Sequence, residues 1–75
     1  MIRFDLQHER PVELDVFSVA GRHVVSLVDR TLPAGTHTVR WDGRDQAGVK
    51  VAPGVYLSRL KAGDFMATRK ITVAR

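Results

Sequence analysis

The sequence predicts an all-β fold, in which short antiparallel strands form two packed sheets. All six glycines fall in turn-like clusters, and the runs between them are rich in Val, Ile, Thr and aromatic residues that alternate with polar ones. Turn signals recur about every eight to twelve residues, and no window has clean helical spacing. This pattern is typical of an immunoglobulin or fibronectin III-like β-sandwich of about six to seven strands. The chain has no cysteine, so the sandwich has no disulfide.

Strict alternation predicts the first strand, where Ile2, Phe4 and Leu6 share one face. The third is less regular, because Val24-Val25 and Leu27-Val28 break the alternation. Either both faces of that strand are partly covered or a bulge shifts its phase. The predicted strands are residues 2–6, 12–17, 23–28, 36–41, 55–60 and 65–73.

Trp41 is the largest side chain available for burial. Alternation in the fourth strand puts it on the same side as His37 and Val39. Burying a tryptophan removes about 150 to 250 Å² from water. We therefore expect Trp41 at the centre of the core, and a cost of about 3 to 5 kcal/mol for Trp41→Ala.

The 75 residues, of which 44% are hydrophobic and 27% charged, predict one domain spanning residues 1–75. So short a chain has little room for a deep substrate cavity, which argues against an enzyme. The sequence shows neither a signal peptide nor a membrane-spanning run. Export would need a signal on a longer parent protein. The net charge of +4 is dispersed, as in a solubilising surface.

The loop of residues 42–48 is the candidate metal site. Asp42 and Asp45 stand three apart beside glycines, and carboxylate oxygens are calcium ligands. The loop lacks the ligand alternation of an EF-hand, and Asp side chains commonly bond the amides of their own turn. Turn stabilisation is therefore the favoured interpretation, with calcium as the alternative.

Other chemistry finds little support in the sequence. The three histidines stand singly, without the spacing that brings two ring nitrogens to one metal. No serine lies in a nucleophile turn, and Glu13 and Asp15 fall on the predicted solvent face of their strand. We expect no catalytic residues and no cofactor.

Basic residues on the last two predicted strands form a possible recognition patch. They are Arg59, Lys61, Arg69 and Lys70. Nucleic-acid binding is not expected, because no aromatic residues interleave with them, and Tyr56 and Phe65 are expected to pack inward. The simpler interpretation is an edge hairpin whose charges prevent aggregation.

Several turn and strand residues also occur together at the spacing of a known family. They are Gly21, Gly35, Trp41, Asp42, Gly43, Asp45, Gly48, Gly54 and Tyr56. The chain resembles the FlgD-type immunoglobulin-like domain, named for the flagellar hook-capping protein. It is similar to the C-terminal sorting domains of the type IX secretion system. The resemblance covers nearly the whole chain and implies a non-catalytic C-terminal module of a longer exported bacterial protein that is extracellular or on the cell surface.

Three functions compete. The first is export, sorting or surface attachment, with residues 65–75 as the recognised element. The second is structural assembly of the flagellar hook-cap type. The third is a carbohydrate-binding or adhesive module, which needs a row of exposed aromatic residues. We expect protein partners, either secretion machinery or neighbouring domains, and an exposed edge strand that permits dimers; no membrane insertion is expected.

Overall fold

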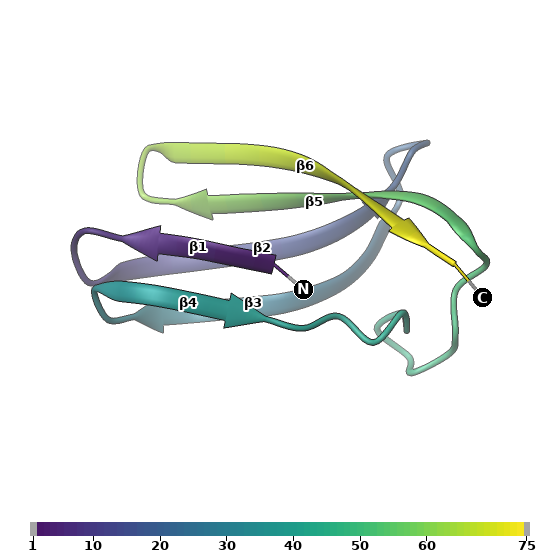
Figure 1. Ribbon diagram of the computed structural model, residues 1–75, viewed down its shortest axis with the longest axis horizontal. Coiled ribbons are helices and arrows are strands. Elements are labelled where there is room, and N and C mark those ends of the chain that lie inside the picture. The colour runs from purple at the N-terminus through teal and green to yellow at the C-terminus, as the bar shows by residue number, and fades with distance from the viewer. Residues whose placement is uncertain (1, 75) are drawn as a thin grey trace.

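The computed structural model describes residues 2–74, which form two antiparallel sheets (Figure 1). The strands are β1 (Ile2–Leu6), β2 (Arg10–Ser18), β3 (His23–Leu32), β4 (Gly35–Val39), β5 (Gly54–Ala62) and β6 (Phe65–Val73). The large sheet has the order β3-β2-β5-β6, and β1 pairs with β4 in a small sheet. The predicted immunoglobulin-like sandwich is confirmed, with six strands and no helix in the described part of the chain.

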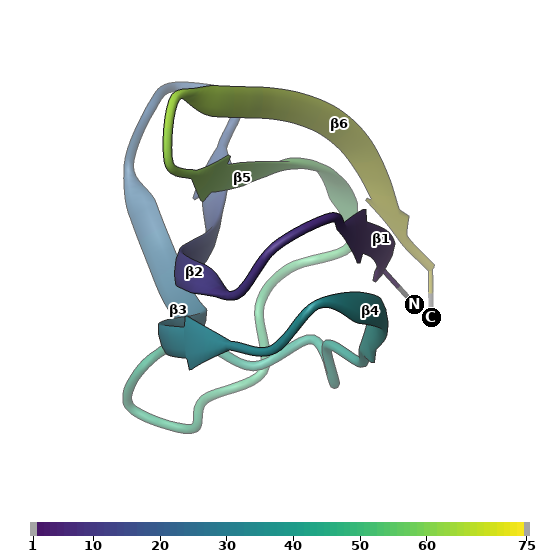
Figure 2. The ribbon, with the colours of Figure 1, turned by 90° about the vertical axis from the view of Figure 1, so that its left-hand side faces the viewer.

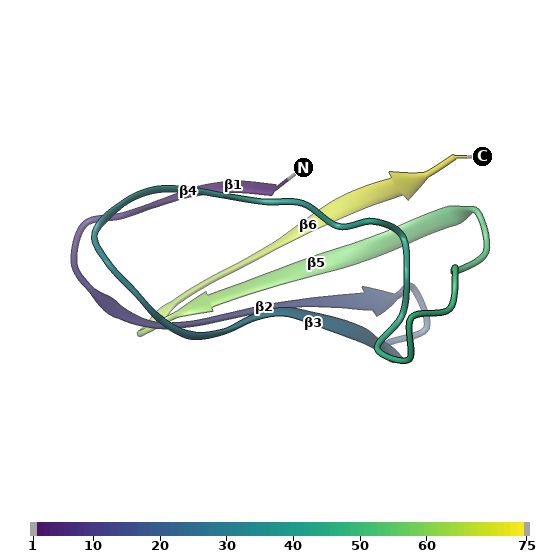
Figure 3. The same cartoon turned by 90° about the horizontal axis from the view of Figure 1, so that it is seen from below.

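The two sheets form the layers of the sandwich. Figure 3 shows β1 and β4 in one layer and β2 and β3 in the opposite one. The large sheet curves, so that in Figure 2 β6 arches round the side of β1. No helix within residues 2–74 is long and apolar enough to cross a membrane.

The predicted bounds of β1 and β6 are confirmed, whereas those of the other strands shift. Strands β2, β3 and β5 extend beyond the predicted ranges. Strand β4 ends at Val39, two residues before the predicted end, because Val39 pairs with Ile2 at the beginning of β1. A strand makes no further inter-strand hydrogen bonds beyond the residue at which its partner strand begins or ends.

The irregular third strand contains bulges. Pairing with β2 passes from Leu14–Val28 to Asp15–Ser26, which skips Leu27, and later skips Val24 in the same way. Each extra residue shifts the phase of alternation by one. Of the two explanations left open by the sequence, the bulge is confirmed.

The core is aliphatic and lies between the sheets. Phe4 and Leu6 enter it from the small sheet, and β2 contributes Val12, Leu14 and Val16, which are at most 1% exposed. The remaining buried apolar residues are Val25, Val28, Leu32 and Ala62. Strand β2 dominates because it is covered by β1 and β4 on one face and flanked by a strand on each side.

Trp41 does not fill the core, so the prediction for this residue is wrong. Its side chain is half-buried, and the ring meets Tyr56 edge to face at 5.4 Å. Because β4 has already ended at Val39, Trp41 lies in the loop beyond the small sheet.

The β5–β6 hairpin closes with a tight turn that contains Gly63, one of the glycines in the turn-like clusters of the sequence. Ala62 pairs with Phe65, which leaves Gly63 and Asp64 as a two-residue loop. Gly63 has a φ of 61°, a conformation that costs other residues energy, and a Cβ there would lie 2.9 Å from Nη1 of Arg10. The backbone therefore favours glycine at this position, whereas the close approach to the flexible end of the Arg10 side chain could be relieved by a shift of that side chain.

Candidate functional site

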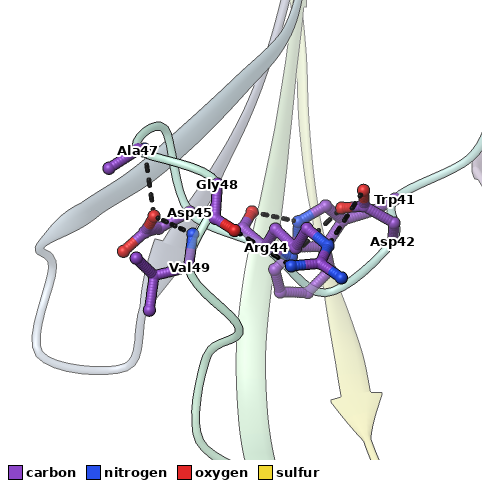
Figure 4. A network of polar contacts seen from close by, with 7 residues as sticks. All are labelled: Trp41, Asp42, Arg44, Asp45, Ala47, Gly48 and Val49. Atoms are coloured by element: carbon purple, nitrogen blue, oxygen red, sulfur yellow. Dashed lines mark hydrogen bonds and ion pairs between the residues drawn. The ribbon is translucent and has the colours of Figure 1, made fainter.

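The loop that follows β4 is held by its own polar groups (Figure 4). The Oδ1 atom of Asp45 accepts hydrogen bonds from the backbone N–H of Ala47 at 3.0 Å and of Val49 at 2.9 Å. The backbone N–H of Asp45 in turn donates to the carbonyl of Val49 at 2.8 Å. One carboxylate thus closes the whole turn, as aspartates do when they replace missing backbone partners.

Asp42 makes a second, overlapping turn. Its Oδ1 accepts from the backbone N–H of Arg44 at 3.1 Å, and its Oδ2 lies 3.8 Å from Nε of the same arginine. The Arg44 guanidinium also donates to the carbonyl of Gly48 at 3.0 Å, and the Trp41 indole donates to the Arg44 carbonyl at 2.9 Å. Asp42, Arg44 and Trp41 therefore tie both ends of the loop together.

Gly43 is buried inside this loop and has a φ of 77°. Its carbonyl accepts a hydrogen bond from Val51 at 2.9 Å, which joins the loop to the approach of β5. The remaining motif glycines also have positive φ; they are Gly21, Gly35, Gly48 and Gly54. The glycines and aspartates of the pattern therefore have structural roles in turns.

These contacts favour turn stabilisation over calcium binding. Three of the four carboxylate oxygens of Asp42 and Asp45 already face donors from this loop. Among residues 2–74, no three His, Cys, Asp or Glu side chains group closely enough to hold a metal ion. A calcium ion takes six to eight oxygen ligands, and two aspartates committed to amides supply few of them.

The four basic residues of the closing hairpin do not form one patch. Arg69 pairs with buried Ser58 and shares its inward face, whereas Lys70, one residue on, points to the opposite face. Arg59 and Lys61 lie on the outer face, where the Arg59 guanidinium covers the Phe17 ring at 4.6 Å. Consecutive residues of a strand point to opposite faces, so lying on neighbouring strands does not by itself join these side chains into one patch.

The aromatic residues are similarly dispersed. Phe65, expected to pack inward, is 57% exposed, because the small sheet does not extend over β6. Tyr56 is half-buried against Trp41, and its hydroxyl donates to the Ala52 carbonyl at 2.6 Å. Phe4 stacks on His37 within the small sheet. Within residues 2–74 these rings make no continuous row of the kind that sugar binding requires.

The fold brings together one constellation that sequence reasoning missed. Asp15 and Ser26 are cross-strand neighbours, and the Ser26 hydroxyl donates to Asp15 Oδ1 at 2.6 Å. His23 Nε2 lies 3.1 Å from both of those side-chain oxygens. The β3 bulges set this register, which alternation alone does not reveal. In a catalytic triad the serine and the acid contact different ring nitrogens, whereas here both face Nε2. The cluster is therefore a polar cross-strand contact.

A sequence profile now identifies the fold family. The profile of the FlgD Ig-like domain matches residues 2–64, from the first residue of β1 to the β5–β6 turn. The chain belongs to the FlgD Ig-like domain family. All nine motif residues, from Gly21 to Tyr56, lie inside the FlgD Ig-like match, whereas β6 lies outside it. No curated protein and no solved structure matches the chain significantly.

Proposed function

We propose that this FlgD Ig-like domain is a non-catalytic assembly module that holds neighbouring protein subunits, in the manner of a hook-cap domain. The observation that carries the proposal is the family match over residues 2–64. The site geometry supports it, because the polar clusters of the loop and of Asp15, His23 and Ser26 bond among themselves. Their groups serve the fold and not a reaction.

The domain exposes apolar side chains that suit protein contacts. Val49 in the loop is 61% exposed and Met66 on the outer face of β6 is 58% exposed. Exposed apolar residues rimmed by charge are common at protein interfaces. On this proposal the module works in an extracellular or surface assembly, and its partners are other subunits of that assembly.

The test is photo-crosslinking in the cell that makes the parent protein. A benzoylphenylalanine is introduced at Val49 or at Met66, and at Glu13 as a control on the charged outer face of β2. We expect crosslinks from the first two positions to another subunit of the same extracellular structure. Crosslinks only to secretion machinery, or none to any protein, would contradict an assembly role.

Export or sorting is the alternative function, and it depends on β6 as the recognised element. The strand supports this idea by standing at an open sheet edge with exposed Phe65. The test fuses a signal peptide and a reporter to residues 1–75 in a host with a type IX system. A fusion ending before Phe65 is compared with full-length fusions carrying Phe65→Ser or Lys70→Glu, which keep the strand. Secretion of every fusion to the same extent would rule out β6 as the recognised element.

A further inference from the structure

The inner side of the sandwich remains open between β1 and β6. The small sheet has two strands and the large sheet has four, so the edge of β1 that faces away from β4 has no partner strand among residues 2–74. Alternate residues of β1 direct their N–H and C=O groups toward this edge. An unpaired edge beside an uncovered face is the arrangement to which a further strand adds.

A groove follows that edge. One part, of about 280 Å³, lies between β1 and the inner faces of β5 and β6, and a second part, of about 340 Å³, continues past the end of β1. The two parts adjoin, because their linings share Asp5, Leu6, Ala62 and Phe65. The floor is apolar apart from the Ser58 hydroxyl, which has only a long 3.4 Å contact to the Arg69 carbonyl.

The lining of the groove is positively charged at both ends. Arg69 lies at one end of the β6 face and Arg10 at the other end, beyond Phe65. Neither arginine makes a salt bridge within residues 2–74. The Nε atom of Arg10 is buried without a hydrogen-bond partner in the described part of the chain.

The one carboxylate of the lining, Asp5, is already engaged. Its Oδ1 accepts the hydroxyl of Thr36 at 2.6 Å, across the β1–β4 pair. That hydrogen bond leaves the negative charge of Asp5 in place, but Arg3, Arg10 and Arg69 all line the groove, so its arginines outnumber this carboxylate and its lining has a net positive charge. A guanidinium in a partly buried groove favours a carboxylate, which it binds with two parallel hydrogen bonds.

We infer that the groove binds an extended, acidic peptide segment of a partner protein as an added strand on the free edge of β1. Two apolar side chains of the segment lie over the floor between Leu60 and Phe65, and a carboxylate at each end meets Arg69 or Arg10. Phe65 to Arg69 spans about 13 Å of strand. Four inward positions of an extended segment, about 20 Å apart from first to last, therefore match the groove. The inference rests on the groove alone and stands whichever parent protein carries the domain.

A second copy of the chain fits the groove less well. Pairing two β1 edges would bring two arginine-lined grooves of a chain with a net charge of +4 together. Like charges face to face oppose association. Phosphates of a nucleic acid would meet the arginines, but they cannot use the backbone edge of β1. The acidic peptide satisfies both the edge and the charges.

The experiment titrates the ¹⁵N-labelled domain with a blocked nine-residue peptide, followed by amide shifts in NMR spectra. The peptide sequence is Thr-Glu-Thr-Val-Thr-Val-Thr-Glu-Thr, so that the glutamates and valines share one face of an extended strand. One control peptide has lysine in place of both glutamates. A second control keeps the glutamates and carries N-methyl groups on the backbone amides of the edge that faces β1. We expect shifts along β1 and β6 with the first peptide only, at concentrations below about 1 mM.

Two matched variants test the charge assignment. Arg69→Glu and Lys70→Glu change the net charge equally, but their side chains lie on opposite faces of β6. Arg69→Glu is expected to weaken binding of the glutamate peptide about tenfold or more and to permit binding of the lysine peptide. Lys70→Glu is expected to change the affinity less than about twofold, because its charge lies across the sheet and is screened.

Several outcomes would overturn the inference. The first is the absence of amide shifts at peptide concentrations below about 1 mM. The others are equal affinity for the N-methylated peptide, and equal losses of peptide affinity in Arg69→Glu and Lys70→Glu. Shifts along β1 that depend on protein concentration without peptide would assign the edge to a second copy. Stronger binding of a single-stranded oligonucleotide at the same amides would assign the arginines to phosphate. Dispersed spectra of both variants establish that each one is folded.

Discussion

Strands β2 and β6 have the same length and belong to the same sheet, yet they differ in what covers them. Both have nine residues. Three side chains of β2 are at most 1% exposed, whereas no residue of β6 is buried. The small sheet lies over β2 but not over β6, and only the second strand has an open side. Position relative to the small sheet, and not strand propensity, decides which strand stabilises the domain and which is available to a partner.

The largest expected effect comes from the covered strand. Leu14→Ala removes a completely buried side chain at the centre of β2. We expect a loss of about 3 kcal/mol, the usual cost of a cavity left by leucine, out of a total near 4 to 11 kcal/mol for a chain of this length. Urea unfolding followed by circular dichroism measures it. A loss below about 1 kcal/mol, as for a surface change, would show that β2 is not the centre of the core.

Trp41 is expected to have an intermediate effect, because it lies at the end of the sandwich and not within it. Trp41→Ala removes the edge-to-face contact with Tyr56 and the hydrogen bond to the Arg44 carbonyl. The two together are worth about 2 kcal/mol. Trp41→Phe keeps the ring contact and loses the donor, so it should cost about half as much. If Trp41→Ala were as destabilising as Leu14→Ala in the same urea series, the loop would belong to the core.

Asp45 tests the loop without touching either sheet. Asp45→Ala removes two hydrogen bonds to turn amides and should cost about 1 kcal/mol, because the loop is exposed and water replaces part of the loss. Asp45→Asn retains an acceptor oxygen and is the control. Addition of millimolar calcium to the wild type should leave its melting temperature unchanged. A rise in that temperature which Asp45→Ala abolishes would instead identify a calcium site.

Most of the fold could be predicted from the sequence because its signals are local. Alternation identified β1 and β6, and the glycine of the last turn identified the hairpin. The depth of Trp41 could not be predicted, since it depends on where β1 begins opposite Val39. The contact of His23 with Asp15 and the separation of Arg69 from Lys70 likewise depend on register across strands. The groove forms because the small sheet has two strands and the large sheet has four. The residue pattern within one strand does not reveal how many strands its sheet contains.

Phe65 and Met66 give the smallest effect on stability and the sharpest test of the open side. They are consecutive in β6 and almost equally exposed, at 57% and 58%, but only Phe65 lines the groove. Replacing either one by serine should change the free energy of unfolding by no more than about 0.5 kcal/mol, because neither is buried. Phe65→Ser should nevertheless weaken binding of the acidic peptide severalfold, while Met66→Ser should leave it unchanged. Equal losses of peptide affinity would mean that the outer face of β6 contributes as much to peptide binding as the groove does. The difference between β2 and β6 would then explain the stability of the domain but not where a partner binds.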